Sequence, residues 1–280
     1  MMSDHRQVAW ACRGLAAAVL VLAGNGFTPL AVAAPANPQI EDMTWTELRD
    51  RVAAGSTTIL VPIGGTEQNG PHMVLGKHNT RVRLLAVAIA QALGNALVAP
   101  VLAYVPEGGI DPPEAHMRFP GTISISEATF EALLEGSARS FRRHGFRHVV
   151  FLGDHGGYQK NMERVATRLN REWAGQPACK VHALLDYYRV TQSAYVEALK
   201  SRGFSAEEIG THAGLADTAL AMAVDPGLVR QEMLNREPKA GPREGVYGDP
   251  RRATAEVGRL GVERVVEASV TAIRALARKH

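Results

Sequence analysis

The strongest constraint on the fold is a regular alternation between short apolar strands and amphipathic helices. Segments with the composition of buried strands lie at residues 57–63, 96–104, 147–152 and 181–187. Helical patterns lie at residues 44–55, 80–93, 124–143, 159–173 and 253–278. Strands separated by helices are typical of right-handed β-α-β crossovers, so the sequence predicts an α/β fold with a mainly parallel central sheet.

Three side chains are predicted to begin helices. Thr44 and Glu47 have the spacing of a capping box, which predicts that the first helix starts at Thr44. Asn79 is expected to cap the helix at 80–93, because asparagine accepts hydrogen bonds from the free N–H groups of a first turn. Ser124 and Glu127 have the spacing of a capping box, which predicts that the next helix starts directly after Ser124.

The loops that follow the strands are where function is expected, because open parallel sheets bind ligands beyond the carboxyl ends of their strands. The loops at 64–78, 106–122 and 153–158 are long or rich in polar groups. The first supplies Glu67 and His78, and the third supplies His155. If their strands are neighbours in the sheet, Glu67, His78 and His155 could meet around one ion.

Two histidines and one glutamate form a known catalytic zinc set that leaves a fourth position for water, and manganese or iron accept the same donors. No H-E-x-x-H motif is present to strengthen that interpretation. From spacing alone, the same residues could instead be polar loop residues that cap helices.

Residues 1–33 have the pattern of a secretory signal peptide. Arg6 and Arg13 flank the start of a short apolar core at residues 15–22, and an A-x-A cleavage site ends at Ala33. The apolar run is too short and too broken for a good membrane span. We expect cleavage after Ala33, a mature domain at residues 34–280, and a periplasmic or secreted protein without stable membrane insertion. An uncleaved N-terminal anchor is the alternative.

The charge pattern argues against nucleic-acid binding. The chain has 31 basic and 28 acidic residues, and its small excess is not concentrated beyond pairs such as Arg142 and Arg143. With 280 residues, 46% of them hydrophobic, the chain can fill one large core. Cys179 is the single cysteine that follows the signal segment, so no internal disulfide is expected.

The loop after the first strand resembles the signature of the creatininase (creatinine amidohydrolase) family. That signature is usually written S-x-E-Q-H-G-P-H-L-P-L-G-T-D, and residues 65–78 here are G-T-E-Q-N-G-P-H-M-V-L-G-K-H. The resemblance continues, in the family's order, through residues 119–124, 153–157, 212–214 and 245–250. It implies a three-layer α/β/α fold, metal-dependent hydrolysis of a non-peptide C–N bond in a small amide, and an oligomer, often a homo-hexamer.

Several positions depart from the family pattern. Asn69 stands at a metal-binding histidine of the family, and His78 stands at the aspartate that bridges two metals. Gly157 replaces a metal-binding glutamate of creatininase itself, and Leu215 replaces the first acid of the H-A-G-E-x-E pattern. A neutral imidazole cannot bridge two cations as a carboxylate does.

Glu67 and His155 match metal ligands of the family, which together with His78 leaves one complete ligand set. We therefore expect one ion rather than two, held by Glu67, His78 and His155. Zinc is expected, with manganese or iron as alternatives.

Other residues are candidates for proton transfer or substrate contact. Asp154, Asp217 and Glu114 could carry a proton to the leaving nitrogen. Asp154 is equally a candidate for fixing the tautomer of a ligand histidine. His212 is expected in the site because its H-A-G context matches the family. His72 and His116 either face the substrate or are structural histidines.

These observations favour an exported metal-dependent amidohydrolase that cleaves a small amide. The alternative is a catalytically inactive relative that binds a small molecule or a metal in the periplasm. Asn69, His78 and Leu215 favour this alternative, because they depart from the family pattern. Creatinine itself is not expected as the substrate. The family recognises it with aromatic residues near the site, whereas the tryptophans after the signal segment are Trp45 and Trp173.

Overall fold

The computed structural model describes residues 37–176, 178–237 and 239–278, and the predicted signal peptide lies outside them. The strands are β1 (Thr58–Ile63), β2 (Ala96–Val98), β3 (His148–Gly153) and β4 (Lys180–Ala183). The α-helices are α1 (Trp45–Ala53), α2 (Lys77–Leu93), α3 (Glu127–Arg143), α4 (Gln159–Glu172), α5 (Leu185–Gln192), α6 (Ala194–Lys200), α7 (Ala206–Ile209), α8 (Leu215–Val224), α9 (Gln231–Leu234) and α10 (Ala255–Arg278). Short 3-10 helices are η1 (Ile40–Asp42), η2 (Ala115–Arg118), η3 (Gly156–Tyr158), η4 (Pro226–Leu228), η5 (Pro242–Glu244) and η6 (Pro250–Arg252). None of the described helices has the length and apolar character that a membrane span requires.

The described strands form one parallel sheet in the order β2-β1-β3-β4, which confirms the predicted α/β fold. β1 and β3 pair along their whole length, from Thr58 opposite His148 to Ile63 opposite Gly153. Because Ile63 and Gly153 end neighbouring strands, the loops that carry Glu67 and His155 leave the sheet side by side.

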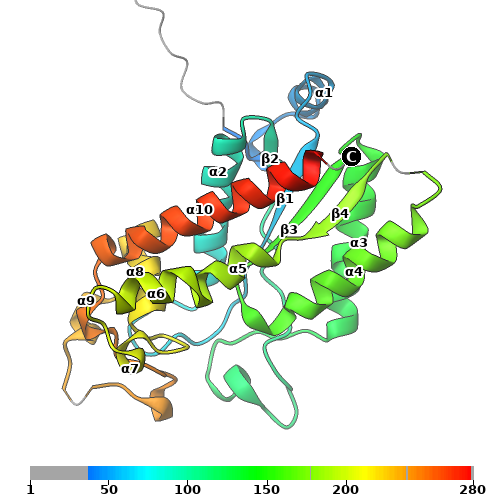
Figure 1. Cartoon of the computed structure of the whole chain (residues 1–280). Coiled ribbons are helices and arrows are strands. Elements are labelled where there is room, and N and C mark those ends of the chain that lie inside the picture. Colours follow the sequence, from blue (N-terminus) through cyan, green and yellow to red (C-terminus); the bar gives the residue numbers. More distant parts are fainter. Residues whose placement is uncertain (1–36, 177, 238, 279–280) are drawn as a thin grey trace, which may run out of the picture. The chain divides into compact units, whose positions relative to one another are not determined.

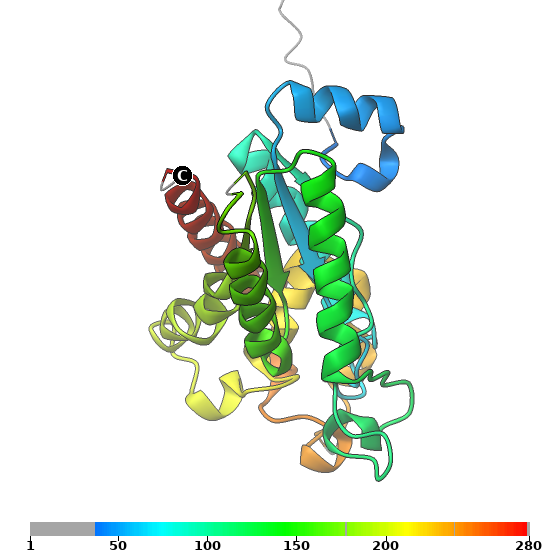
Figure 2. The same ribbon diagram turned by 90° about the vertical axis from the view of Figure 1, so that its right-hand side faces the viewer.

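Helices cover both faces of the sheet and make three layers (Figures 1 and 2). On one face, Ile59 belongs to an apolar cluster with Phe130 of α3 and Val165 of α4. On the other face, Leu60 belongs to a second cluster with Leu85 of α2 and residues of α10. Successive strand residues point to opposite faces, and both faces of β1 are buried. Residues 59–63 of β1 are accordingly all apolar.

Two strands are shorter than the sequence predicts. β2 ends at Val98, because Pro100 cannot donate a ladder hydrogen bond, and the chain then returns to β1 through a parallel bridge between Leu102 and Ile63. β4 ends at Ala183, and residues 185–187 begin α5 instead of continuing the strand. Periodicity cannot separate a short apolar strand from the start of a buried helix.

Of the three predicted helix caps, Thr44 is confirmed by its capping box with Glu47, whereas the other two are wrong. α2 begins at Lys77, which places Asn79 inside its first turn, where Oδ1 accepts a hydrogen bond of 2.9 Å from the N–H of Gly65. α3 is capped by Ser126 rather than by Ser124. The Ser124 hydroxyl instead accepts a 3.0 Å hydrogen bond from the N–H of Glu107 and donates one of 2.7 Å to the carbonyl of Gly108. Asn79 and Ser124 do not cap helices because their side chains form hydrogen bonds with the backbone of distant loops.

Candidate metal centre

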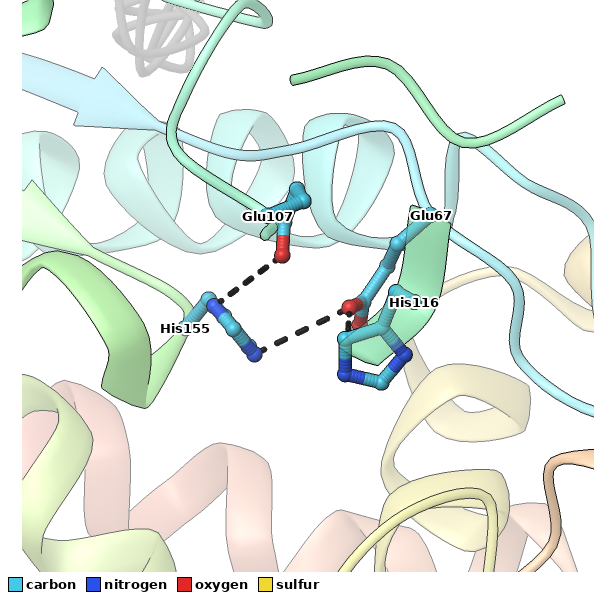
Figure 3. Close-up of side chains that lie close together, drawn as sticks. All are labelled: Glu67, Glu107, His116 and His155. Carbon is cyan, nitrogen blue, oxygen red and sulfur yellow. Dashed lines mark ion pairs between the residues drawn. The ribbon is translucent and has the colours of Figure 1, made fainter. Parts of the chain in front are cut away.

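Four side chains that could hold a metal ion face one another beyond the carboxyl ends of the strands (Figure 3). Glu67 follows β1 and His155 follows β3. Glu107 lies five residues after Leu102, which pairs with Ile63 at the end of β1. His116 lies in η2. One ligand atom from each residue lies within 4.8 Å of the others. We call these residues the four-donor group.

Glu67 contacts both histidines of the four-donor group. Its Oε2 lies 3.2 Å from Nε2 of His116 and 3.7 Å from Nε2 of His155. Nδ1 of His155 lies 3.5 Å from Oε2 of Glu107. These separations exceed the roughly 2.7–2.9 Å of a charge-assisted N–H···O hydrogen bond. The donor atoms therefore face a common point, and their separations are longer than such hydrogen bonds.

The two carboxylates of the group are buried with oxygens that lack partners. Glu67 is 0% exposed and Glu107 is 3% exposed. Among the described residues, Oε2 of Glu67 and both carboxylate oxygens of Glu107 have no hydrogen-bond partner. Buried polar atoms are rarely left so, and buried charges are normally paired or coordinate metals. Two carboxylates and two imidazoles are donors that zinc, manganese and iron accept, so the group fits a divalent cation.

The two histidines have the protonation state that metal ligation requires at pH 7, whereas Glu107 must lose a proton first. Burial, reinforced by the neighbouring carboxylate of Glu67, raises the pKa of Glu107 to about 9. Burial lowers the pKa of His155 to about 4, and it also lowers the pKa of His116. Both imidazoles are therefore neutral at pH 7 and offer a lone pair, as metal ligation requires.

Tyr158 and Gly65 bring the strand-end loops together. The Tyr158 hydroxyl accepts a 3.1 Å hydrogen bond from the N–H of His155 and lies 2.7 Å from the carbonyl oxygen of Gly64. Gly65 has φ of 150°, and a side chain there would collide with the carboxylate of Glu107. Glycine is therefore required for Glu107 to reach the group.

His78 joins Glu67 to another buried carboxylate. Its Nε2 lies 2.7 Å from Oε1 of Glu67, and its Nδ1 lies 2.6 Å from Oδ2 of Asp154. Asp154 also accepts hydrogen bonds from the Tyr187 hydroxyl at 2.8 Å and from Nε of Arg81 at 2.9 Å. Both ring nitrogens of His78 thus have carboxylate partners. The geometry favours His78 as the residue that orients Glu67, and direct ligation by His78 stays a prediction.

Asp217 is held by two cations beneath the site. Its carboxylate oxygens lie 2.6 Å from Nζ of Lys77 and 2.6 Å from a terminal nitrogen of Arg81. Burial alone would raise the pKa of Asp217, but Lys77 and Arg81 hold it well below its usual value. Asp217 therefore stays ionised and is a poor proton donor near neutral pH.

His212 lies at the edge of the four-donor group. Its Nδ1 is 3.9 Å from Oε1 of Glu67, and its Nε2 is 3.0 Å from the carbonyl oxygen of Gln68. The rings of His212 and His116 lie 4.6 Å apart, and the Gln68 side-chain amide lies 3.0 Å from a nitrogen of each. Gln68 therefore orients both rings.

The remaining candidates lie farther from the donors. Glu114 is exposed just before η2, and its carboxylate lies beside Gly109. His72 is buried, with Nε2 2.9 Å from the hydroxyl of Thr218 in α8, so it is structural rather than substrate-facing. The amide of Asn69 donates a 2.9 Å hydrogen bond to the carbonyl of Glu67 and so fixes the loop.

A hollow of 500 Å³ reaches the four-donor group. Glu107, His116 and His155 form part of its wall, and Gly109 lies in the wall as well. Its size lies in the range of roughly 300–1,000 Å³ that small-molecule sites occupy. A second space of 80 Å³, lined by His78, Asp154 and Asp217 among others, is too small for a comparable ligand. The larger hollow can bring a small molecule to the donors.

Comparison with known proteins identifies the family of this chain. The family model described as "Creatininase: Creatinine amidohydrolase" matches residues 41–273. The chain belongs to the creatininase family. Members of this family are amidohydrolases that act on C–N bonds.

Two curated relatives and a solved structure are similar to this creatininase-family chain. The creatinine amidohydrolase of Pseudomonas putida is 29% identical over 258 residues, which are 84% of this chain and 95% of the relative. The mycofactocin precursor peptide peptidase of Mycolicibacterium smegmatis is 31% identical over 221 residues, which are 71% of this chain and 77% of the relative. The solved structure named "Creatininase Mn" superposes with a TM-score of 0.70 at 28% identity and covers 85% of this chain and 98% of that one.

Sequence reasoning within the creatininase family missed Glu107 and His116 as possible metal donors. Both lie in the loop at 106–122 that was expected to carry function, but that loop offers several acidic residues without periodicity. The sequence did offer one signal for Glu107. This residue lies soon after the apolar segment at residues 96–104, where a strand-end loop is expected to begin. Its proximity to Glu67 depends on the bridge between Leu102 and Ile63, which the sequence does not reveal.

Proposed function

We propose that this protein is a metal-dependent amidohydrolase that cleaves a non-peptide C–N bond of a small amide. The observation that carries the proposal is the pair of buried carboxylates, Glu67 and Glu107, whose unpartnered oxygens face His116 and His155. These four residues would hold a divalent ion. When bound, such an ion would supply Lewis-acid activation of water and of a carbonyl oxygen.

The residues of this chain provide the other functions. Glu67 is oriented by His78, and His155 and His116 enter the site as neutral imidazoles. Hydrolysis adds hydroxyl to the carbonyl carbon and a proton to the departing nitrogen, so the site needs a proton carrier. Of the predicted carriers, Asp154 and Asp217 are bound by cations, whereas the carboxylate of Glu114 lies beside the wall of the 500 Å³ hollow. We propose Glu114 as the residue that delivers the proton to the departing nitrogen.

We propose that one ion binds rather than two, with zinc favoured over manganese or iron. The support is local: Lys77 and Arg81 already neutralise Asp217 and Asp154, so these carboxylates have no need of a second metal. The amide of Asn69 is used to hold backbone carbonyls. The manganese in the name of a similar solved structure supports a metal-dependent site without fixing the metal here.

We further propose that the protein is exported, with cleavage after Ala33, and that the mature chain self-associates as a homo-hexamer. The support for export is the signal pattern of residues 1–33, and the support for the hexamer is the resemblance to the family. The even spread of basic and acidic residues supports a protein that does not bind nucleic acid.

The deciding experiment is metal analysis of protein purified without a polyhistidine tag, after supplementation with zinc or manganese. We expect one ion per chain, and hydrolysis of at least one cyclic or linear amide in a panel that also contains short peptides. Peptides belong in the panel because one relative is named a peptide peptidase. Near-zero occupancy after supplementation would contradict the proposal and favour the inactive, ligand-binding alternative.

A further inference from the structure

A second hollow, of 580 Å³, adjoins the four-donor group on the side of His116. Its wall combines Arg118 and Arg243 with the aromatic side chains of Phe119 and Tyr247. We call it the basic hollow. His116 also lies in the wall of the 500 Å³ hollow, so the two spaces meet at a candidate metal donor.

Among the described residues, the two arginines of the basic hollow lack carboxylate partners, in contrast to two arginines close to Arg243 in the sequence. Nearby Arg236 pairs with Glu244, and Arg251 pairs with Asp249 at 2.7 Å. Within the part of the chain that the structure describes, Arg118 and Arg243 have no carboxylate within 4.0 Å. Nε of Arg118 donates a 3.3 Å hydrogen bond to the carbonyl of Ala115, which leaves its terminal nitrogens to bind an anion. Guanidinium forms paired hydrogen bonds with a carboxylate.

The loop that carries Arg243 is fixed to the metal centre. Gly245 has φ of 77° and lies so close to the side chain of Gln68 that any larger residue would collide with it. Gln68 in turn donates to a ring nitrogen of His116 at 3.0 Å. Tyr247 pairs with His212 through backbone hydrogen bonding. The backbone that carries Arg243 therefore has a defined position relative to the donors, and its exposed side chain lies in the wall of the basic hollow.

We propose that the basic hollow binds the carboxylate of an amide substrate, so that the substrate is an acidic amide such as an N-acylated amino acid. Arg118 and Arg243 bind the carboxylate, and Phe119 and Tyr247 contact the apolar part beside it. The amide group then lies toward His116 and the other donors. This inference rests on the proposed hydrolase and specifies its substrate class.

The test measures binding of N-acetyl-L-phenylalanine and of its uncharged counterpart, N-acetyl-L-phenylalaninamide, by isothermal titration calorimetry. The full-length mature protein is used after chelator treatment, so that an ion cannot bind the carboxylate directly. We expect the acid to bind at least about tenfold more tightly than the amide, which corresponds to about one hydrogen bond to a charged group.

Substitution then assigns the binding to the arginines. Arg118→Gln and Arg243→Gln should each weaken binding of the acid about tenfold and leave binding of the uncharged amide unchanged. Arg171→Gln, which removes an exposed arginine from α4, is the matched control and should change neither affinity. Circular dichroism melting curves verify that each variant is folded.

Equal affinity for the acid and the amide, or an acid affinity that is insensitive to both arginine substitutions, overturns the inference. The two proposals are refuted by different results. The hydrolase proposal is refuted by near-zero metal occupancy, whereas this inference is refuted when binding of the acid to the metal-free protein does not depend on the arginines. Arginine-dependent binding in a protein that takes up no ion would establish an acidic-amide binder instead of an enzyme.

Discussion

Nε2 of His78 lies 2.7 Å from Oε1 of Glu67, and the other nitrogen of the same ring lies 2.6 Å from Asp154. A histidine placed in this way holds Glu67 in the orientation that leaves its second oxygen free for the four-donor group. The relationship separates two possible ligand sets, one that includes His78 directly and one in which His78 acts through Glu67.

The first prediction distinguishes those ligand sets. We expect His155→Ala and His116→Ala to lose the ion, and His78→Ala to bind it about 10–100-fold more weakly, as is usual when a residue that orients a ligand is removed. Competition with a chelator of known affinity measures the difference. Complete loss in His78→Ala with full retention in His116→Ala would instead establish Glu67, His78 and His155 as the ligands.

A related substitution tests the number of ions. His78→Asp restores the carboxylate of the family pattern but leaves Asn69 and Leu215 in place. We expect this variant to keep an ion, at a stoichiometry near that of the wild type, because the shell of a second ion is still incomplete. Inductively coupled plasma mass spectrometry gives the stoichiometry. Two ions per wild-type chain would refute the single-ion centre and leave the hydrolase proposal standing.

The second prediction concerns proton release. The pKa of Glu107 is raised to about 9, so at pH 7 this carboxyl group holds a proton in the metal-free protein. An ion needs the carboxylate, so binding should release about one proton per ion at pH 7, and affinity should rise with pH until about pH 9. His155, with a pKa of about 4, contributes no proton at pH 7.

Calorimetric titration in buffers of different ionisation enthalpy counts the released protons. Glu107→Gln is the control, since an amide has no proton to release in this way and is a weaker ligand. An unchanged proton count in Glu107→Gln would assign the proton to another group.

The third prediction separates the stability of α3 from the geometry of the site. Ser124→Ala removes the hydroxyl that holds the backbone of Glu107, and Ser126→Ala removes the true cap of α3. Each should lower the free energy of unfolding by about 1 kcal/mol. Metal affinity should fall in Ser124→Ala but stay at the wild-type value in Ser126→Ala. Equal metal affinity in the two variants would show that Ser124 does not position Glu107.

The fourth prediction concerns the buried charges around Asp154. Asp154→Asn removes the charge that Arg81 and His78 share, and breaking such a buried pair costs about 3–5 kcal/mol. Urea unfolding measures the loss. Asp186→Asn, at an exposed position in the nearby α5, is the control and should stay within about 0.5 kcal/mol of the wild type. A loss below about 1 kcal/mol in Asp154→Asn would show that solvent or a rearranged Arg81 compensates.

The fifth prediction fixes the start of the mature protein. Export in a double-membrane bacterium should yield a chain that begins at Ala34, because the A-x-A motif ends at Ala33 and Pro35 disfavours cleavage one residue later. Intact-mass analysis of the periplasmic fraction reads the N-terminus directly. A mass that corresponds to a chain starting at Met1 would support the uncleaved anchor.

The pairing of β1 with β3 comes from the structure. The sequence was sufficient to predict the parallel sheet and the placement of Glu67 and His155 in loops that follow strands, because apolar runs and helical periods are local signals. It was not sufficient for Glu107 and His116. Their positions depend on Leu102 pairing with Ile63, which is a contact between distant segments.

The same limit explains the helix caps and the end of β4. Asn79 and Ser124 have the local chemistry of caps, but each bonds to a loop that only the folded chain brings near. Tyr187 follows an apolar run that suits a strand, yet it lies in α5 with its hydroxyl on Asp154. In each case a tertiary hydrogen bond outweighed a local preference.

Gly245 allows a surface segment to rest on Gln68 while the metal donors are carried by loops rooted in the sheet. The wall that Arg243 contributes to the basic hollow is thereby carried by a stretch of polypeptide without metal donors, whereas Arg118 shares η2 with His116. A lineage could change the amides it accepts by altering residues 239–245 without rebuilding the ion site. For the protein engineer, that stretch is the natural place to diversify when a new specificity is sought.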